Sequence, residues 1–339
     1  MKKLSLLDKL LFFVNSLLAT LLILSYLTYF ISPNSISLIS IISLSVPFLI
    51  LINLIFAIYW LIKLKKQFLL SLFVLLIGFP YLTKFYNISE KKILLESDTK
   101  IMSYNVRMFN KYKNIKEEGV DKKIIDFITN KQPDILCLQE YSNDKKSILK
   151  FPYRYTFSKK KSIFGQAIYT RYKILNKGSL NFSSPTNNNA IFVDILKGKD
   201  TIRIYNVHLQ SLQINPQKEE LTKENGEKLR KRVEKAFKIQ ANQIELLKLH
   251  MAKSNLKTII CGDFNNNAFS WAYHQLKENK NDAFEEAGKG FGKTYDFPFP
   301  FRIDFILTDE SFPVNNFKTY PVKYSDHNPI MARISFNNN

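Results

Sequence analysis

The sequence predicts an α/β domain with two packed β-sheets, preceded by an N-terminal set of membrane-spanning helices. Two observations predict this division. Residues 10–62 carry no charged side chain and consist mainly of Leu, Ile, Phe and Val. From residue 100 onward, short apolar runs alternate with charged segments of helical periodicity, which is typical of a layered domain. The chain of 339 residues therefore has two physically different parts.

Composition excludes several other classes of protein. With 46% hydrophobic residues, 10 Gly and 12 Pro, the chain is neither globally disordered nor fibrous. Two cysteines are too few for a disulfide-rich scaffold or a multi-cysteine zinc site. The formal charge of +20 attracts anions, although a chain that uses Lys, Asn and Ile throughout owes part of this excess to composition.

The uncharged N-terminal stretch is too long for one membrane span. As a single helix, its 53 residues would measure about 80 Å, whereas the hydrocarbon core of a bilayer is about 30 Å thick. Residues 32–35 (SPNS) supply turn chemistry, so we expect one span near 10–31 and a second near 37–62. A third span is expected near 67–84, where the apolar stretch is at the short limit. Residues 1–90 are therefore interpreted as a transmembrane anchor of about three spans.

The distribution of lysines predicts the orientation of this anchor. The first apolar run is too long for a cleaved signal peptide, and no small-residue cleavage site follows it. Basic residues flank the first span and separate the second span from the third: Lys2, Lys3, Lys9, Lys63, Lys65 and Lys66. Basic loops stay in the cytoplasm, so an odd number of spans places the C-terminal domain on the outer side of the cytoplasmic membrane.

The rest of the chain is expected to form a linker at residues 91–99 and one domain at residues 100–337. Strands are predicted at 101–106, 134–139, 164–170, 190–196, 201–207, 257–261, 303–307 and 329–335. Amphipathic helices are predicted at 120–129 and 228–251.

Short polar side chains stand at the ends of several predicted strands. These segments are SYNVR (103–107), LQE (138–140), NVHLQS (206–211), GDFN (262–265), RIDFIL (302–307) and SDHNP (325–329). A strand carries its terminal residues to one edge of a sheet, so groups far apart in sequence can converge there. Taken singly, each segment is weak evidence, because a Glu after a strand is usually solvated and a lone His is usually structural. Their ordered combination is informative.

In that order, the segments closely resemble the endonuclease/exonuclease/phosphatase superfamily, whose members share the DNase I-like fold. The resemblance covers roughly residues 98–336, and GDFN followed by RIDFIL and SDH is its most specific part. It implies a four-layer α/β sandwich with the site at one rim of two packed sheets, so residues 100–337 are expected to be the catalytic domain. The first ninety residues lie outside the resemblance, which suggests a membrane-anchored, bacterial-type member.

The residues also fit metal-assisted hydrolysis of a phosphoester. Attack of water on a phosphodiester requires charge neutralisation, a positioned nucleophile and help for the leaving oxygen. A hard divalent ion such as Mg²⁺, with Mn²⁺ as the alternative, takes oxygen ligands. Glu140 is the expected principal ligand, with Asn105 and Asp326 beside it.

Five further residues are expected to carry the chemistry. Asp263 would align or deprotonate the attacking water, and Asn265 would hold that water and a phosphoryl oxygen. His208 and His327 would donate to the charge that develops on phosphorus. Asp304 would orient His327 and keep it protonated, because an adjacent negative charge raises the pKa of a histidine.

His208 narrows the branch of the superfamily. Abasic-site repair endonucleases usually have tyrosine there, whereas histidine resembles the DNase I, sphingomyelinase and phosphoinositide-phosphatase branches. The expected function is a membrane-anchored, divalent-metal-dependent phosphoesterase, and foremost a phosphodiesterase acting on nucleic acid or a phospholipid headgroup. The alternative is a non-catalytic polyanion-binding or scaffold module of a membrane assembly. Retention of the whole residue set favours the enzyme.

Residues 294–301 (TYDFPFPF) form an aromatic-rich segment just before RIDFIL. Placed near the rim, this segment could stack on bases or touch lipid. Equally, its prolines could stiffen a loop that packs its own rings.

Overall fold

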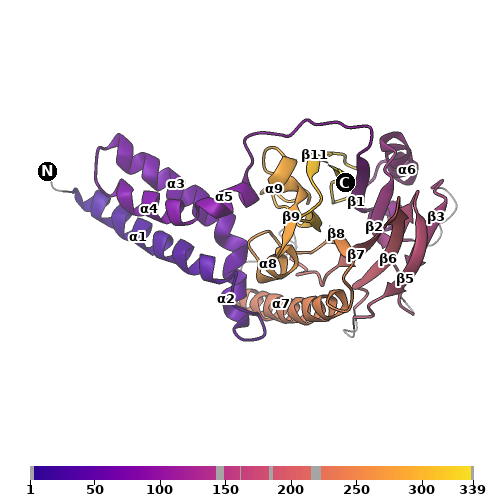
Figure 1. Ribbon diagram of the computed structural model, residues 1–339. Helices are drawn as coiled ribbons and strands as arrows, with labels where there is room; N and C mark the ends of the chain where they lie inside the picture. Colours follow the sequence, from indigo (N-terminus) through magenta and orange to yellow (C-terminus); the bar gives the residue numbers. More distant parts are fainter. Residues whose placement is uncertain (1–3, 143–148, 161, 183–185, 215–222, 337–339) are drawn as a thin grey trace.

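The computed structural model describes residues 4–142, 149–160, 162–182, 186–214 and 223–336 (Figure 1). An N-terminal helical bundle, at the left of Figure 1, is followed by a domain with two β-sheets. The bundle contains α1 (Leu6–Leu27), α2 (Ser37–Ile42), the 3₁₀ helix η1 (Ser43–Ser45), α3 (Val46–Ile62), α4 (Phe68–Ile77) and α5 (Phe79–Phe85). The domain contains η2 (Arg107–Asn110), α6 (Val120–Lys131), α7 (Lys223–Met251), α8 (Trp271–Lys277) and α9 (Ala283–Ala287).

The helices of the bundle correspond to the expected spans with shifted boundaries. Within the described residues, Leu6–Leu27 and Ser37–Ile62 are long and apolar enough to cross a membrane, and α4 with α5 makes a third if that bent pair is one span. The pair meets at an angle of 74°. The first helix begins before residue 10 because the Ser5 hydroxyl caps it, accepting the backbone N–H of Asp8 at 3.1 Å. Pro47 lies in the first turn of α3. Backbone N–H groups in a first turn have no partner within the helix, so a proline there costs no helical hydrogen bond.

Each of the two sheets has six strands. The first has the order β11 (Val314–Thr319), β12 (Ile330–Ile334), β1 (Thr99–Asn105), β2 (Ile135–Tyr141), β4 (Gly165–Thr170), β3 (Tyr153–Phe157). The second has the order β5 (Lys173–Ser179), β6 (Asn189–Lys197), β7 (Asp200–His208), β8 (Lys257–Asp263), β10 (Asp304–Asp309), β9 (Lys280–Asp282). The pairs β1–β2 and β7–β8 are parallel, and the remaining pairs are antiparallel.

Alternation along the strands builds four layers. In β1, Ile101 points into the core between the sheets, whereas Met102 points outward into a cluster with α6. In β8, Ile259 faces the inner core and Ile260 faces the cluster formed with α7 and α8. The domain is therefore a helix–sheet–sheet–helix sandwich, which confirms the expected fold class.

The strands that the sequence analysis did not predict are the four edge strands, β11, β3, β5 and β9. An edge strand is less buried than a central one, and polar residues there limit pairing with other chains. In β5 (KILNKGS) the side chains are exposed or half-buried, so no clear apolar pattern marks the strand. Residues 91–98, within the expected linker, form neither helix nor strand.

One end of the helical bundle packs against the domain. Helix α2 lies beside α7 (Figure 1), and the Ser37 hydroxyl donates to Glu234 at 3.2 Å. The Asn267 side chain donates to the Ser43 carbonyl at 3.0 Å. Near the opposite end of the bundle, Lys63 pairs with Asp8 at 2.6 Å. The domain and this lysine therefore lie at opposite ends of the bundle.

Candidate active site

The topology gathers all eight predicted site residues at one edge of the sandwich. Parallel strands end at the same edge, and a strand antiparallel to them begins there. At this edge β1, β2, β7 and β8 end, while β10 and the segment before β12 begin. The residues delivered there are Asn105, Glu140, His208, Asp263, Asn265, Asp304, Asp326 and His327.

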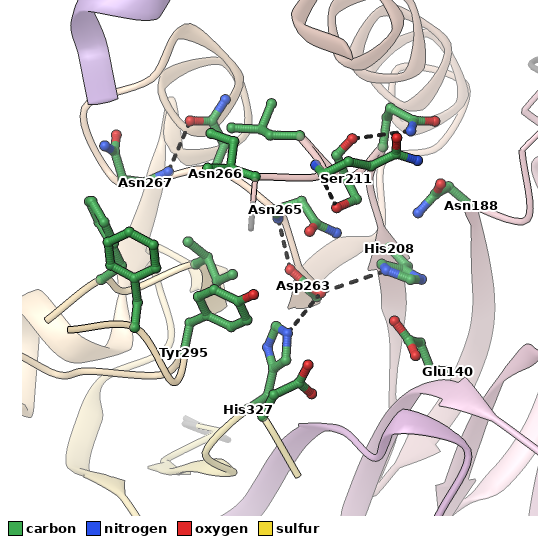
Figure 2. Close-up of a pocket in the computed structure, with 18 of the residues that line it drawn as sticks. Glu140, Asn188, His208, Ser211, Asp263, Asn265, Asn266, Asn267, Tyr295 and His327 are labelled. Carbon is green, nitrogen blue, oxygen red and sulfur yellow. Dashed lines mark hydrogen bonds and ion pairs between the residues drawn. The ribbon is translucent and has the colours of Figure 1, made fainter. Parts of the chain in front are cut away.

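Asp263, the last residue of β8, lies at the centre of the group (Figure 2). Its carboxylate accepts the backbone N–H of Asn265 at 2.8 Å and the side-chain amide of Asn105 at 3.0 Å. The Nε2 atoms of His208 and His327 lie 3.6 and 3.7 Å from the same carboxylate. Burial raises the pKa of Asp263 to about 6, against the opposing effect of the neighbouring histidines. A carboxylate of this kind can accept a proton near neutral pH.

The glycine before Asp263 allows strands β7 and β8 to approach closely beside the site. Gly262 has a φ of 147°, a conformation that other residues rarely adopt. A Cβ atom at this position would lie 1.9 Å from the Val207 carbonyl oxygen. The GDFN segment therefore needs glycine for a steric reason, next to its functional Asp.

His327 is held by Asp304, as the sequence analysis expects. Its Nδ1 lies 2.9 Å from an Asp304 carboxylate oxygen, and both side chains are buried. Burial by itself lowers the pKa of His327, but the charges of Asp304 and Asp263 outweigh it, so this pKa lies well above the usual range. These charges favour the protonated form of His327, whose Nε2 faces Asp263.

His208 lies on the other side of Asp263, in a less polar environment. Its ring is buried beside the ring of Phe164, with 5.7 Å between centroids. Burial lowers the pKa of His208, which favours its neutral form. Its buried Nδ1 has no hydrogen-bond partner among the described residues. The pKa values of the two histidines are thus shifted in opposite directions, although both side chains face one carboxylate.

Glu140 projects into the same space from β2 (Figure 2). The pairing of β2 with β4 is irregular between Leu138 and Tyr141, and Glu140 itself has a φ of 48°. Side chains of a regular strand alternate between its two faces; this irregularity breaks the alternation at Glu140, whose carboxylate points into the pocket. Burial raises the pKa of Glu140, and the charge of Asp326 raises it further. Two carboxylates thus lie near each other at the site.

Asn105 and Asp326 are both in place, with partners that the sequence did not indicate. The Asn105 amide oxygen accepts the Arg107 backbone N–H at 3.1 Å, and its nitrogen faces Asp263 and Glu140. The Asp326 carboxylate forms an ion pair with the Arg107 guanidinium at 3.1 Å. Arg107, in the SYNVR segment, therefore belongs to the site.

Asn265 lies at the site with its amide nitrogen donating to the Leu209 carbonyl at 3.0 Å. An amide nitrogen carries two N–H donors, so this bond uses one of them and fixes the side chain in orientation.

The group opens into a pocket of about 700 Å³. The pocket is lined by six of the predicted residues: Glu140, His208, Asp263, Asn265, Asp326 and His327. Sequence reasoning did not assign Asn188 or Tyr295 to the site, although both line the pocket (Figure 2). The Tyr295 ring lies 5.1 Å from the His327 ring, and the aromatic segment at 294–301 was the one signal for it.

The carboxylates fit a divalent cation at Glu140 and Asp326. A cation between these two neighbouring, half-buried carboxylates offsets their repulsion, and carboxylate oxygens suit Mg²⁺. The Asn105 amide nitrogen, not its oxygen, faces Glu140 and Asp263, so its expected role as a metal ligand stays a prediction. A second cluster, Asp263, Asp304 and His327, has ligand atoms within 4.8 Å of one another. His327 in this cluster is already paired with Asp304 through Nδ1, which suits the cluster better to proton transfer.

Two family models match the chain, one over the apolar N-terminal helices and one over the two-sheet domain. Residues 102–327 match the endonuclease/exonuclease/phosphatase family. Residues 8–85 match a domain of unknown function (DUF8431). No curated protein matches the chain.

Solved structures with the same fold include three of distinct description. The human nocturnin catalytic domain with bound sulfate has a TM-score of 0.54 at 18% identity, covering 74% of this chain and 97% of its own. A mannosyl-6-phosphatase of Bacteroides thetaiotaomicron has a TM-score of 0.51 at 20% identity, and the match covers 70% of this chain and 100% of the phosphatase chain. Zebrafish (D. rerio) TDP2 with a single-strand DNA product has a TM-score of 0.52 at 16% identity, and the match covers 71% of this chain and 100% of the TDP2 chain. With its fold and two thirds of its length matched, the chain belongs to the endonuclease/exonuclease/phosphatase family.

Proposed function

We propose that the protein is a membrane-anchored, divalent-metal-dependent phosphoesterase, and foremost a phosphodiesterase. The observation that carries this proposal is the placement of a buried carboxylate, Asp263, between His208 and His327 at the wall of a pocket, with His327 held by Asp304. Family membership supports phosphoester chemistry. The structural neighbours include a phosphatase and a protein crystallised with a DNA product, which agrees with this class of reaction.

The side chains of the site have complementary roles in hydrolysis. Asp263 accepts a proton from water while the water oxygen bonds to phosphorus, and the bond from phosphorus to the leaving oxygen breaks. His327, held through Nδ1 by Asp304, presents a protonated Nε2 to the phosphoryl oxygens as negative charge builds on them. His208 lies on the opposite side of Asp263 and orients the same phosphoryl group. A divalent ion held by Glu140 and Asp326 would supply further positive charge to the phosphate and the leaving oxygen.

The complete set of side chains favours this proposal over a non-catalytic scaffold. A binding module has no need for an Asp304–His327 pair, because a lysine or arginine supplies positive charge without a buried partner. The pair costs desolvation of both groups, and it is useful where a proton must stay on one ring nitrogen.

The anchor supports a location of the domain on the outer side of the cytoplasmic membrane. Lys9, Lys63, Lys65 and Lys66 lie near one end of the bundle, and the domain packs against the other. Lys2 and Lys3, which also belong to the expected cytoplasmic cluster, lie outside the described residues. With basic ends retained in the cytoplasm, the domain faces outward when α4 and α5 form the third crossing.

A direct assay tests the proposed reaction. Full-length protein in phosphatidylcholine nanodiscs is supplied with Mg²⁺ and bis(p-nitrophenyl) phosphate, and release of p-nitrophenol is followed. We expect hydrolysis by the wild type and a loss of about 10²–10⁴-fold in Asp263→Asn, the usual contribution of a general base. Absence of wild-type hydrolysis, or an equally active Asp263→Asn, contradicts the proposal. Parallel assays on DNA, RNA and phospholipid vesicles then identify the substrate class.

A further inference from the structure

The anchor contributes part of the wall of the active-site pocket. Leu44 of η1 and Phe48 of α3 line the same pocket as His208 and Asp263. Phe48 lies in the first turn of α3, within the second segment long and apolar enough to cross a membrane. Its side chain is 37% exposed, so it presents an apolar surface to the pocket instead of filling a core. The catalytic domain alone therefore does not enclose the site.

Aromatic rings of the domain continue this apolar surface. Phe299 lies 4.0 Å from Phe48 between ring centroids, and Phe301 lies 6.0 Å from it. Phe297 and Phe301 both line the pocket, and their rings are 5.0 Å apart. The segment at 294–301 thus packs its own rings, and it also joins them to the anchor. Together, Leu44, Phe48, Phe297 and Phe301 form what we call the apolar wall.

The apolar wall is fixed to the catalytic residues. Leu44 packs against a buried cluster that contains Leu212, four residues beyond His208. Asn267 lines the pocket, and its side-chain amide donates to the Ser43 carbonyl at 3.0 Å. This bond connects the loop that follows GDFN to η1, directly before α3. These contacts hold the wall in a set position relative to Asp263.

The charges in the pocket argue against a nucleic-acid strand as its occupant. Proteins that bind single strands track the phosphates with Lys and Arg along a groove. Among the described residues that line this pocket there is no Lys or Arg, although the chain has 49 of them. The Arg107 guanidinium at the site is already paired with Asp326. The lining combines polar groups that suit one phosphate, such as His208 and His327, with the side chains of the apolar wall. This is the arrangement that an amphiphile matches.

We infer that the substrate is a lipid phosphoester, whose hydrocarbon chain lies against the apolar wall while its phosphate meets Asp263, His208 and His327. The inference rests on the proposed phosphoesterase activity and names its substrate class. Phe48 lies in the first turn of α3, within a segment long enough to cross a membrane, so the apolar wall lies next to the proposed membrane surface. A lipid substrate can therefore enter the pocket while part of its hydrocarbon chain stays in the bilayer. The anchor is then part of the substrate-binding site as well as a tether.

A pair of chromogenic phosphodiesters tests this inference. Methyl p-nitrophenyl phosphate and dodecyl p-nitrophenyl phosphate share the reacting group and differ only in the hydrocarbon chain. Both are assayed with the full-length protein in phosphatidylcholine nanodiscs with Mg²⁺. We expect the wild type to have a much lower KM for the dodecyl ester. In Phe48→Ala, KM for the dodecyl ester rises by about tenfold or more, the scale of a lost apolar pocket contact, and kcat/KM for the methyl ester falls much less than kcat/KM for the dodecyl ester.

Two further variants separate the wall from general effects on the anchor. Phe73→Ala removes a phenylalanine of α4 that is 60% exposed and does not line the pocket, and it leaves both esters unaffected. Phe48→Leu keeps an apolar side chain and restores most of the preference for the dodecyl ester. Equal KM values for the two esters in the wild type, or equal losses in Phe48→Ala and Phe73→Ala, overturn the inference while leaving the proposed phosphodiesterase intact.

A binding measurement keeps the inference testable in an enzyme that cleaves neither ester. Dodecylphosphonate and methylphosphonate cannot be hydrolysed, and their affinities for the same nanodisc samples are measured by calorimetry. We expect Phe48→Ala to weaken binding of dodecylphosphonate selectively. Wild-type binding of dodecylphosphonate with no loss in Phe48→Ala overturns the lipid inference, whereas selective loss without any turnover overturns the proposed phosphodiesterase alone.

Discussion

At the scale of single residues, the site depends on two acids in different surroundings. Asp263 is surrounded by hydrogen-bond donors and two histidines, which suits it to proton transfer. Glu140 lies near Asp326, and its raised pKa reflects burial and that neighbouring charge. A bound cation reverses this unfavourable interaction, so the two acids are expected to respond differently to metal.

The first prediction concerns Glu140 and the metal. Glu140→Gln retains the shape but removes a charge from the expected ligand set, so activity should fall by about 10²-fold or more, the scale of one lost electrostatic contact. EDTA should inactivate the wild type to a similar extent. Mg²⁺ should also raise the melting temperature of the wild type, because a ligand of the native state stabilises it, and should raise that of Glu140→Gln much less. An enzyme that is indifferent to EDTA contradicts the metal assignment.

The second prediction distinguishes catalytic histidines from structural ones. His208→Ala and His327→Ala should each lose about 10²-fold or more in kcat, as expected for a lost donor to developing charge. His250 on α7 is the control, because its Nδ1 lies 2.9 Å from the Tyr205 hydroxyl and its side chain does not line the pocket. His250→Ala should keep most of the activity in the same assay. Similar losses at all three positions would indicate a general effect on stability.

At the scale of elements, the close approach of β7 and β8 places His208 beside Asp263. In the parallel register these two residues are direct neighbours, at the ends of their strands. Gly262 permits that approach, since a side chain there would collide with the Val207 carbonyl. The geometry of the site is therefore linked to the packing of two strands.

The third prediction uses two glycines of opposite character. Gly262→Ala should destabilise the protein by about 2 kcal/mol or more, because it combines a steric collision with an unfavourable φ. Gly226 in α7 is exposed, and a Cβ atom added there would meet no atom within 4 Å, so Gly226→Ala should stabilise the helix by up to about 1 kcal/mol. Thermal unfolding of the full-length variants in detergent measures both. Melting temperatures that shift in the same direction contradict the steric argument.

At the scale of the whole molecule, the anchor and the domain form one structure with the pocket at their junction. Polar contacts such as Asn34 with Asn242 at 2.9 Å hold the two parts together. The domain packs at the end of the bundle away from Lys63, so in the proposed membrane-anchored form the orientation of the bundle would decide the compartment of the proposed reaction.

The fourth prediction concerns this orientation. Alkaline phosphatase, which is active only outside the cytoplasm, should be active when fused to the C-terminus and inactive when fused after Leu64. Green fluorescent protein fused at the same two positions should show the reverse pattern. An inactive phosphatase at the C-terminus would mean that residues 67–84 do not cross the membrane, and would place the domain in the cytoplasm.

The sequence by itself determined the central strands, the apolar helices and the eight candidate residues of the site. Central strands and long apolar helices leave a local signal, because an apolar environment on all sides requires apolar residues at nearly every position. Site residues leave a different signal, polar groups at strand ends where packing does not call for them. Asp263 in GDFN and His327 in SDHNP were found in this way.

Only the tertiary structure decided which further residues meet these eight. Edge strands such as β5 carry little apolar pattern, and Arg107 shows no local sign of its ion pair with Asp326. Leu44 and Phe48 lie in a segment where almost every residue is apolar, so no periodicity distinguishes a side chain that lines a pocket from one that faces lipid. Contacts between residues more than 150 positions apart, such as Phe48 with Phe299, depend on how the chain is folded as a whole, and local pattern carries no information about them.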